Sequence, residues 1–186
     1  MCGLWSSFFS VPQYTVVILG LDGAGKTSFL QATKPIFSGM PALAPDHIAP
    51  TIGLNVSTID AKGIRLLLQD LGGQVSLRPL WDRYLPESDA VVFVLSAASD
   101  TFRMEEAKQC IAHILQVALP SVPFLLIANK QDLPSHAPLP ELQQFLKQLG
   151  IEGRAATVLP VNSLSGEGVK EAVEWLMETI VERKIS

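Results

Sequence analysis

Gly20-Leu21-Asp22-Gly23-Ala24-Gly25-Lys26-Thr27 is the segment from which the fold of this chain follows most directly. It matches the pattern G-x-x-x-x-G-K-[ST] of a phosphate-binding loop, between a strand-like run at 14–19 and a helical pattern that begins near Gly25. Its glycines let backbone N–H groups curl around a β-phosphate, and the helix N-terminus adds positive potential. Lys26 would reach the β- and γ-phosphates, and the Thr27 hydroxyl would ligate Mg²⁺. The alternative is a Gly-rich turn that only links a strand to a helix, and the matched context disfavours it.

Strand-like and helical patterns alternate along the rest of the chain. Runs at 54–60 and 64–69, joined by a short turn, predict an antiparallel edge pair. Further strand-like runs lie at 90–95, 124–128 and 157–161, and helical patterns lie at 105–119, 139–149 and 169–183. Such alternation implies a parallel sheet with helices on both faces. The sequence therefore predicts an α/β fold with a six-stranded, mostly parallel sheet that has one antiparallel edge strand.

The motif Asn129-Lys130-Gln131-Asp132 follows a strand-like run and indicates which base is bound. The Asp132 carboxylate can accept hydrogen bonds from the ring N–H and the exocyclic amine of guanine, whereas adenine presents an acceptor and lacks that amine. Lys130 can lay its aliphatic stem over the ring, and Asn129 can tie this loop to the phosphate-binding loop. In isolation the motif is also typical of a strand-to-helix turn with an Asp cap. Beside a phosphate-binding loop, guanine binding is favoured.

Asp70-Leu71-Gly72-Gly73-Gln74 follows the second strand of the edge pair. We expect Asp70 to face Mg²⁺ through a water, the Gly73 N–H to meet a γ-phosphate, and Gln74 to orient the attacking water. Alone, the segment also reads as a strand followed by a turn, so its interpretation depends on the phosphate-binding loop.

Two further loops complete the candidate site. Thr51 ends a loop at 33–50 that is long enough to be functional or mobile, and we expect its hydroxyl to ligate Mg²⁺ only when a γ-phosphate is bound. The Ser163 N–H, after the last strand, is placed to donate to the guanine carbonyl oxygen. The neighbouring Ser165 could equally be the N-cap of the final helix.

Composition narrows the class of protein. The 186 residues suit one domain with one core, and 48% hydrophobic and 17% charged residues favour a globular chain. A net charge of −4, with Lys and Arg scattered singly, argues against nucleic-acid binding. Cys2 and Cys110 are too few for a disulfide framework or a metal cage, which favours a reducing compartment. No apolar run approaches the ~20 residues that span a bilayer.

Together these motifs resemble the Arf branch of the Ras superfamily of small GTPases across residues 14–181. The resemblance is carried by the phosphate-binding loop, Pro50-Thr51-Ile52-Gly53-Leu54-Asn55-Val56, Asp70-Leu71-Gly72-Gly73-Gln74, Arg78-Pro79-Leu80-Trp81 and Asn129-Lys130-Gln131-Asp132. Leu71, the tail Ser163-Leu164-Ser165-Gly166-Glu167-Gly168-Val169 and Glu174-Trp175 are most similar to the Arf-related protein subgroup.

The resemblance implies a GTP-binding switch that cycles between GDP and GTP with Mg²⁺, hydrolyses GTP slowly and recruits effectors to membranes in vesicle traffic. It assigns catalysis to Lys26, Gly73 and Gln74, and metal binding to Thr27, Thr51 and Asp70. The nucleotide-binding residues it implies are Asp22, Gly23, Ala24, Gly25, Lys26, Thr27, Ser28, Thr51, Gly73, Asn129, Lys130, Asp132, Ser163 and Leu164. It also implies a monomer that meets an exchange factor, an activating protein, effectors and a membrane surface.

An amphipathic segment is expected before the first strand. Met1, Leu4, Trp5, Phe8 and Phe9 follow helical spacing, which predicts a membrane segment at 1–12 before a GTPase domain at 13–186. Because the segment carries no Lys or Arg, apolar insertion would have to drive any membrane contact. The alternative is a helix that packs in a groove of its own domain, and an Arf-type cycle would use both states in turn. The resemblance implies a cytoplasmic protein that is peripheral on the Golgi or other endomembranes.

Three features depart from the family pattern or from other branches. Gly3 is third, whereas N-myristoylation requires Gly directly after Met, so N-terminal acetylation or acylation of Cys2 are the routes left open. The C-terminus has no prenylation cysteine. The effector-facing trio of the family falls on Leu54, Gln69 and Tyr84, where Gln69 replaces the usual tryptophan and leaves effector choice open.

Two other functions remain open at this point. The chain could be a nucleotide-gated tether that does not use GTP hydrolysis, which Gln74 mildly disfavours. It could also be a P-loop kinase of a small metabolite, which would need an acceptor-binding lid and gives no reason for the motif at 129–132. A copurifying adenine nucleotide would support the kinase, and GDP or GTP would support the switch.

Overall fold

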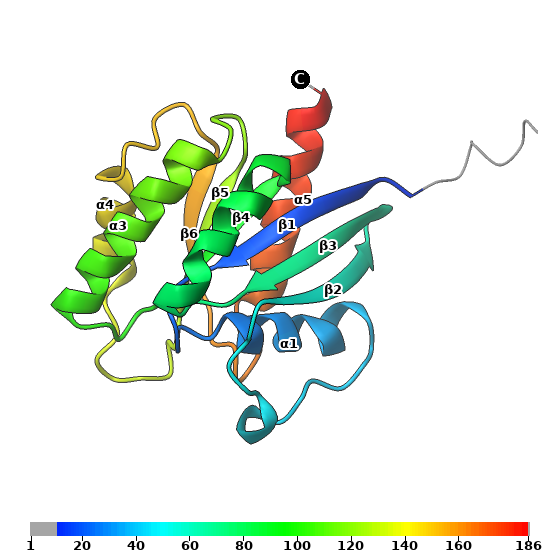
Figure 1. Cartoon of the computed structure of the whole chain (residues 1–186). Helices are drawn as coiled ribbons and strands as arrows, with labels where there is room; N and C mark the ends of the chain where they lie inside the picture. Colours follow the sequence, from blue (N-terminus) through cyan, green and yellow to red (C-terminus); the bar gives the residue numbers. More distant parts are fainter. Residues whose placement is uncertain (1–10, 186) are drawn as a thin grey trace, which may run out of the picture.

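The computed structural model describes residues 11–185, which form a six-stranded sheet with helices on both faces (Figure 1). The strands, in the spatial order β2-β3-β1-β4-β5-β6, are β1 (Gln13–Leu19), β2 (Leu54–Ala61), β3 (Ile64–Leu71), β4 (Ala90–Ser96), β5 (Phe124–Asn129) and β6 (Ala156–Pro160). The edge strand β2 pairs antiparallel with β3, and the other strand pairs of this sheet are parallel. The predicted fold class is confirmed.

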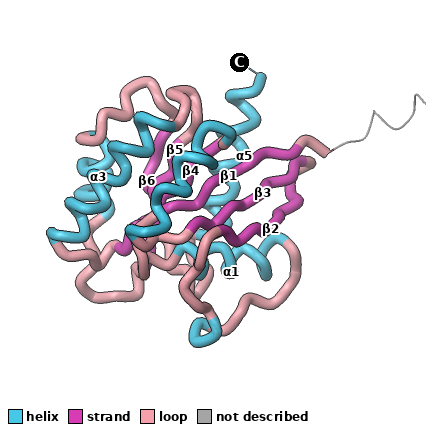
Figure 2. Tube along the Cα trace, in the orientation of Figure 1, coloured by secondary structure: helices cyan, strands magenta, loops and turns pink. Residues whose placement is uncertain are grey.

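The helices divide between the two faces of the sheet (Figure 1, Figure 2). Helices α1 (Lys26–Phe37) and α5 (Val169–Ile185) pack on one face, and α2 (Trp81–Tyr84), α3 (Thr101–Val117) and α4 (Leu139–Lys147) pack on the other. Short 3₁₀ turns lie at Pro45–His47, Val75–Leu80 and Leu85–Glu87.

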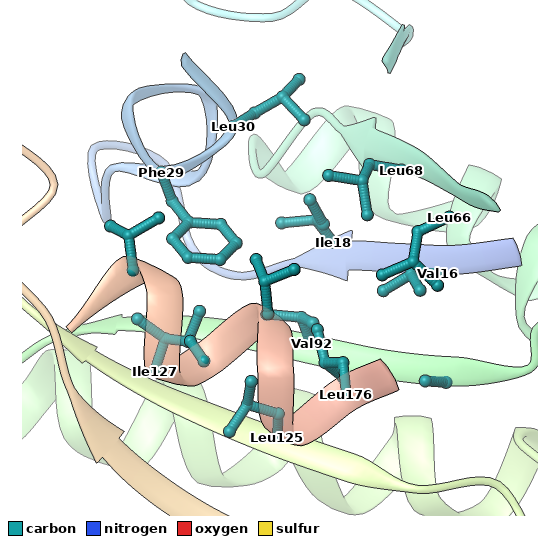
Figure 3. Packing of buried hydrophobic residues seen from close by; sticks show 14 of the residues in the cluster. Val16, Ile18, Phe29, Leu30, Leu66, Leu68, Val92, Leu125, Ile127 and Leu176 are labelled. Atoms are coloured by element: carbon teal, nitrogen blue, oxygen red, sulfur yellow. The ribbon is translucent and has the colours of Figure 1, made fainter. Parts of the chain in front are cut away.

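Alternation along the central strands builds a hydrophobic core on each face. In β1, Val16 and Ile18 belong to the core under α1 and α5, whereas Val17 and Leu19 belong to the core under α3 and α4. Figure 3 shows the first of these cores, where Phe29 of α1 packs with the side chains of the sheet. Two covered faces explain why the inner strands read as continuous apolar runs.

The largest differences from the expected helix boundaries lie at the start of α3 and the end of α1, and each has a local cause. Helix α3 begins at Thr101 instead of 105, because the Asp100 side chain caps it and accepts a hydrogen bond from Arg103 N at 2.8 Å. Helix α1 continues to Phe37, past residue 33 where a loop was expected. Pro35 lies in its last turn, where the missing N–H removes only one helical hydrogen bond.

The expected amphipathic segment, with Met1, Leu4, Trp5, Phe8 and Phe9, lies outside the described residues. The boundary at residue 12 therefore stays a prediction.

The strand register brings the candidate site residues to one edge of the sheet. Ile18 of β1 lies beside Asp70 of β3, and Ser96 of β4 lies beside Asn129 of β5. The loop that follows β1 therefore lies at the same edge as Asp70 and Asn129. In open α/β sheets, ligands bind in the crevice outside the carboxyl ends of the strands.

Candidate functional site

The phosphate-binding loop connects β1 to α1 in a tight turn. Gly25 is the N-cap of α1 with a φ of 95°, and a Cβ at this position would overlap the side-chain amide of Asn129, so only glycine fits. Lys26 is buried, and its Nζ donates a hydrogen bond to Leu21 O at 2.9 Å. The loop thus offers a cation and a helix N-terminus at the same place, as an anion-binding loop requires.

The electrostatics of the loop favour an anionic ligand. Burial lowers the pKa of Lys26, and Asp70 and Asp22 act in the opposite direction without cancelling the effect. The carboxylates around Lys26 therefore do not fully compensate the burial of its ammonium group. Phosphate oxygens bound beside it would supply the missing negative charge.

Three oxygen-bearing side chains meet beside the loop. The Thr27 hydroxyl donates to Asp70 Oδ2 at 2.7 Å, and the Thr51 hydroxyl lies 3.2 Å from the same oxygen. The two threonine hydroxyl oxygens are 2.8 Å apart. The structure therefore brings together the residues predicted to bind Mg²⁺, from α1, from the long loop and from β3.

Asp70 has the features of a carboxylate that lacks its counter-charge. It is fully buried, and its Oδ1 has no hydrogen-bond partner among the described residues. Burial raises the pKa of this carboxyl, although hydrogen bonds from Thr27 and Thr51 and the charge of Lys26 partly lower it. A divalent cation would compensate the buried charge, and ligands that are all oxygen suit Mg²⁺.

The protein would supply only part of a metal's coordination shell. No group of three or more His, Cys, Asp or Glu side chains that could hold a metal occurs within residues 11–185. Mg²⁺ is commonly held by one or two carboxylates together with substrate phosphates and waters. The residues present therefore fit Mg²⁺ that binds together with a phosphate.

One cavity of about 390 Å³ unites most of the predicted phosphate and metal residues. Its lining residues are Asp22, Gly23, Gly25, Lys26, Thr27, Ser28, Ile48, Ala49, Pro50, Thr51, Gly73, Gln74 and Lys130. The cavity lies between the phosphate-binding loop and the two loops that carry Thr51 and Gln74. A ligand in it would contact all of these segments at once.

Asn129 connects the loops on the other side of the cavity. Its Nδ2 donates to Ala24 O at 2.9 Å, and its Oδ1 accepts hydrogen bonds from Ser163 N at 3.1 Å and Ser163 Oγ at 2.8 Å. The side chain is buried, so these bonds are protected from water. The predicted tie between the motif at 129–132 and the phosphate-binding loop is present, and it extends to the loop after β6. Asp132, three residues further on, is exposed.

The loop after β6 differs in detail from the expectation. The Ser163 N–H, predicted to donate to a base, donates to Asn129 in this structure, and the Leu164 N–H donates to Asn162 Oδ1 at 3.0 Å. Helix α5 begins at Val169, so Ser165 is not its N-cap. The Ser165 hydroxyl instead accepts a hydrogen bond from Glu167 N at 3.3 Å.

Sequence reasoning missed two arginines that contact the site, Arg78 and Arg103, and Glu106, which pairs with both of them. Arg103 Nη1 donates to Asp22 Oδ1 at 3.1 Å, and Arg78 Nε donates to Gly73 O at 3.1 Å. Although burial acts to raise it, the hydrogen bond and charge of Arg103 hold the pKa of Asp22 below its usual value. The i, i+3 spacing of Arg103 and Glu106 predicts a helical ion pair, but it contains no information about the loops that the pair meets.

Comparison with known proteins adds independent findings. The model of the ADP-ribosylation factor family matches residues 4–180. The chain is 36% identical over 185 residues to ADP-ribosylation factor-related protein 1 of Bos taurus, which covers 97% of this chain and 92% of the relative. It is 36% identical over 189 residues to ADP-ribosylation factor-like protein 3 of Saccharomyces cerevisiae, with 99% and 94% covered. The Arl6 BBS3 small GTPase from Trypanosoma brucei, solved with the bound nucleotide analogue GppNp, is similar with a TM-score of 0.78 and 33% identity, covering 92% of this chain and 99% of that one.

Proposed function

This chain belongs to the ADP-ribosylation factor family of small GTPases, and we propose that it is a switch that recruits effectors to endomembranes while GTP is bound. As a member of this family it binds GTP and GDP with Mg²⁺ and hydrolyses GTP. The observation that carries the proposal is a cavity in which the phosphate-binding loop meets Thr51 and Gln74. Both residues belong to loops that a γ-phosphate would hold and its loss would release.

The phosphate-binding loop would grip the diphosphate common to GTP and GDP. Backbone N–H groups of the loop would donate to β-phosphate oxygens, and Lys26 would pair with the β- and γ-phosphates. The buried position of Lys26 and its lowered pKa support this assignment, because phosphate would restore the missing negative charge. Asp22, which is exposed, and Ser28, which follows Thr27, line the same cavity as Lys26.

Thr27, Thr51 and Asp70 would hold Mg²⁺. Two observations support these three residues as metal ligands. The hydroxyl oxygens of Thr27 and Thr51 lie 2.7 and 3.2 Å from Asp70 Oδ2, and Asp70 Oδ1 has no hydrogen-bond partner among the described residues. Bound Mg²⁺ supplies positive charge to the β- and γ-phosphate oxygens. The Thr51 hydroxyl would keep this position only while a γ-phosphate holds its loop, which makes it the sensor of the nucleotide.

Guanine would be selected by Asp132. Its exposed carboxylate is free to accept both guanine donors, and the stem of Lys130 would cover the ring. Asn129 would hold this loop at a fixed distance from the phosphate-binding loop through its bonds to Ala24 and Ser163. The preference for guanine then rests on hydrogen-bond donors that adenine lacks.

Hydrolysis would be an in-line attack of water on the γ-phosphorus, with cleavage of the bond to the β–γ bridging oxygen. Gln74, exposed at the cavity, would orient the water. Within residues 11–185 the Gly73 N–H has no acceptor in the protein, so it would be free to donate to a γ-phosphate oxygen. No arginine lies at 50–56, so an activating protein would supply one, worth about 10³- to 10⁵-fold in rate.

The surface beside the nucleotide-sensing loops would receive effectors. Ile52 is 88% exposed and follows Thr51, and Val75 is 71% exposed and follows Gln74. Apolar side chains of this size at the surface favour a protein partner. Of the family trio, Leu54 is exposed, and Gln69 and Tyr84 are half-buried.

Membrane attachment would use the segment at 1–12. Among residues 11–185 no helix is both long and apolar enough to cross a bilayer. We expect more of the full chain to float with phosphatidylcholine liposomes when it is loaded with a non-hydrolysable GTP analogue than with GDP. Neutral lipid is the suitable probe, because the segment carries no Lys or Arg.

A matched pair of variants makes the flotation test specific. Phe8→Glu should abolish the GTP-dependent recovery, whereas Phe102→Glu, at a residue that is 77% exposed on α3, should leave it unchanged. Equal recovery of the unmodified protein with both nucleotides would refute the coupling between GTP binding and attachment.

A further inference from the structure

The segment that carries Gly73 and Gln74 is tied to α3 by one arginine. Arg78, in the turn Val75–Leu80, donates from Nε to Gly73 O at 3.1 Å and from Nη2 to Glu106 Oε1 at 2.6 Å. Its Nη1 lies 3.4 Å from Cys110 Sγ, and its guanidinium carbon is 5.9 Å from the centre of the Trp81 ring. These contacts hold the guanidinium group in one orientation.

The second oxygen of Glu106 is tied to the phosphate-binding loop. Glu106 Oε2 accepts a hydrogen bond from Arg103 Nη1 at 3.2 Å. The same guanidinium group donates to Asp22 Oδ1 at 3.1 Å and to Asp22 O at 2.5 Å. One carboxylate on α3 therefore connects, through two arginines, the backbone carbonyl of Gly73 and the backbone carbonyl of Asp22.

We propose that Glu106 is a positioning residue for GTP hydrolysis, which acts through Arg78 on the Gly73–Gln74 peptide and through Arg103 on the phosphate-binding loop. The inference rests on the proposed function, in which Gly73 and Gln74 act on the γ-phosphate and on water. We call Arg78, Glu106 and Arg103 the α3 bridge. The carbonyl of Gly73 and the N–H of Gln74 belong to one rigid peptide plane, so a bond to the first orients the second.

Burial and charge make Glu106 the centre of the α3 bridge. The side chains of Arg78 and Glu106 are only 18% and 22% exposed, and that of Arg103 is 33% exposed. Without the carboxylate, two guanidinium groups would face each other across a partly buried space and would repel. Both loops would then lose their fixed positions relative to each other. Displacements of about 1 Å can cost ~100-fold in rate.

The test compares Glu106→Gln, Arg78→Met and the double variant in the full-length protein. Glutamine keeps the size of Glu106 and removes its charge, and methionine keeps the apolar stem over Trp81 and removes the donors. We expect each single variant to lower the single-turnover rate of GTP hydrolysis by about 10-fold or more. Arg78→Met leaves the bonds between Arg103 and the phosphate-binding loop in place, so its Kd for GDP, which has no γ-phosphate, should change by less than about 2-fold.

Coupling within the α3 bridge gives a readout that general destabilisation would not. Because Arg78→Met already breaks the connection from Glu106 to Gly73, the loss in the double variant should fall well short of the ~100-fold that two independent losses would give. Glu105→Gln is the matched control, because it removes the same charge from an exposed neighbour on α3 and should hydrolyse GTP at the unmodified rate. Thermal melting of each variant reports its stability separately.

Wild-type hydrolysis by either single variant, or losses that multiply in the double variant, would overturn the proposal. Gln74→Leu separates this failure from a failure of the proposed function. If Gln74→Leu hydrolyses GTP normally, the assignment of the hydrolytic residues is wrong. If Gln74→Leu is slow and Glu106→Gln is not, only the positioning role is wrong.

Discussion

Asp70 shows at the scale of one residue how a binding site costs stability. Its carboxylate is fully buried, one oxygen has no partner among the described residues, and burial raises its pKa. A charge in that position destabilises the folded protein until a cation or a proton compensates it. The native residue is therefore suited to the loaded state of the protein and poorly suited to the empty one.

We predict that Asp70→Asn separates stability from binding. Without nucleotide and with a chelator present, the variant should be more stable than the native protein by about 1 kcal/mol, because an amide is cheaper to bury than a carboxylate. Its affinity for GDP in Mg²⁺ should fall by about 10-fold or more, because the metal loses a charged ligand. Thermal melting and nucleotide titration measure the two effects.

The exposed Glu87→Gln is the control, and it should alter neither quantity. Unchanged affinity of Asp70→Asn for GDP in Mg²⁺ would remove Asp70 from the metal site.

Residues that a local pattern groups together also lie together in the structure, and their roles stay predictions. Lys26 and Thr27 follow from a pattern whose residues are adjacent in the chain, and their neighbourhood in the structure agrees with it. Arg103 and Glu106 could not be found in this way, because their partners Asp22 and Arg78 lie on other elements. These contacts form only when α3 packs beside the two loops, so a short stretch of sequence cannot predict them.

At the scale of elements, the site is an arrangement of loops that strands hold at one edge of the sheet. Asn129 ends β5 and bonds to the loop before α1 and to the loop after β6. The end of one strand and two loops that are distant in the sequence thus share one buried side chain. The rigidity of the site therefore depends on a few hydrogen bonds between loops.

We predict that Asn129→Ala speeds the release of GDP. The change removes the hydrogen-bond partner of Ala24 O and of the Ser163 hydroxyl in a buried part of the site. Each unsatisfied group raises the free energy of this loop arrangement by about 1–3 kcal/mol. The GDP dissociation rate, followed by the exchange of a fluorescent analogue, should rise about 10- to 100-fold.

Gln144→Ala on the exposed side of α4 removes the same amide and should leave the GDP dissociation rate unchanged. An Asn129→Ala variant that releases GDP as slowly as the native protein would show that the loops do not need this tie.

The elements themselves were largely predictable, and the differences lie at their ends. Central strands are recognisable because two covered faces demand continuous apolar runs. The helical pattern begins at residue 105 and so misses the first turn of α3, although Asp100 is a typical N-cap residue. The end of α1 was placed too early, because a proline in a last helical turn costs less than one in the interior.

At the scale of the whole molecule, rigid and movable parts are segregated. The inner strands lie between two hydrophobic cores, whereas β2 is an edge strand with a single neighbour, β3. The long loop and the segment after β3 flank this hairpin on the side of the cavity. An antiparallel hairpin at an edge can shift its pairing while the inner sheet remains unchanged.

We predict a matching pattern of amide hydrogen exchange. Loading with a non-hydrolysable GTP analogue in place of GDP should protect residues 48–56 and 72–84, where a γ-phosphate would order the loops. Exchange in β5 and α5, whose inward side chains are buried, should be the same in both states. Identical exchange across the whole chain with both nucleotides would contradict a switch.

We propose that Asp132 selects guanine for a nucleotide that the phosphate-binding loop grips. Xanthine carries a carbonyl oxygen where guanine carries its exocyclic amine, so an asparagine amide complements xanthine and a carboxylate complements guanine. The most direct measurement is the Kd of the native protein and of Asp132→Asn for GDP and for xanthosine diphosphate, with Mg²⁺ present. The native protein should prefer GDP by about 100-fold or more, and Asp132→Asn should prefer xanthosine diphosphate. An unchanged preference for GDP in Asp132→Asn, or a native protein that binds neither nucleotide, would contradict the assignment of Asp132 as the residue that selects guanine.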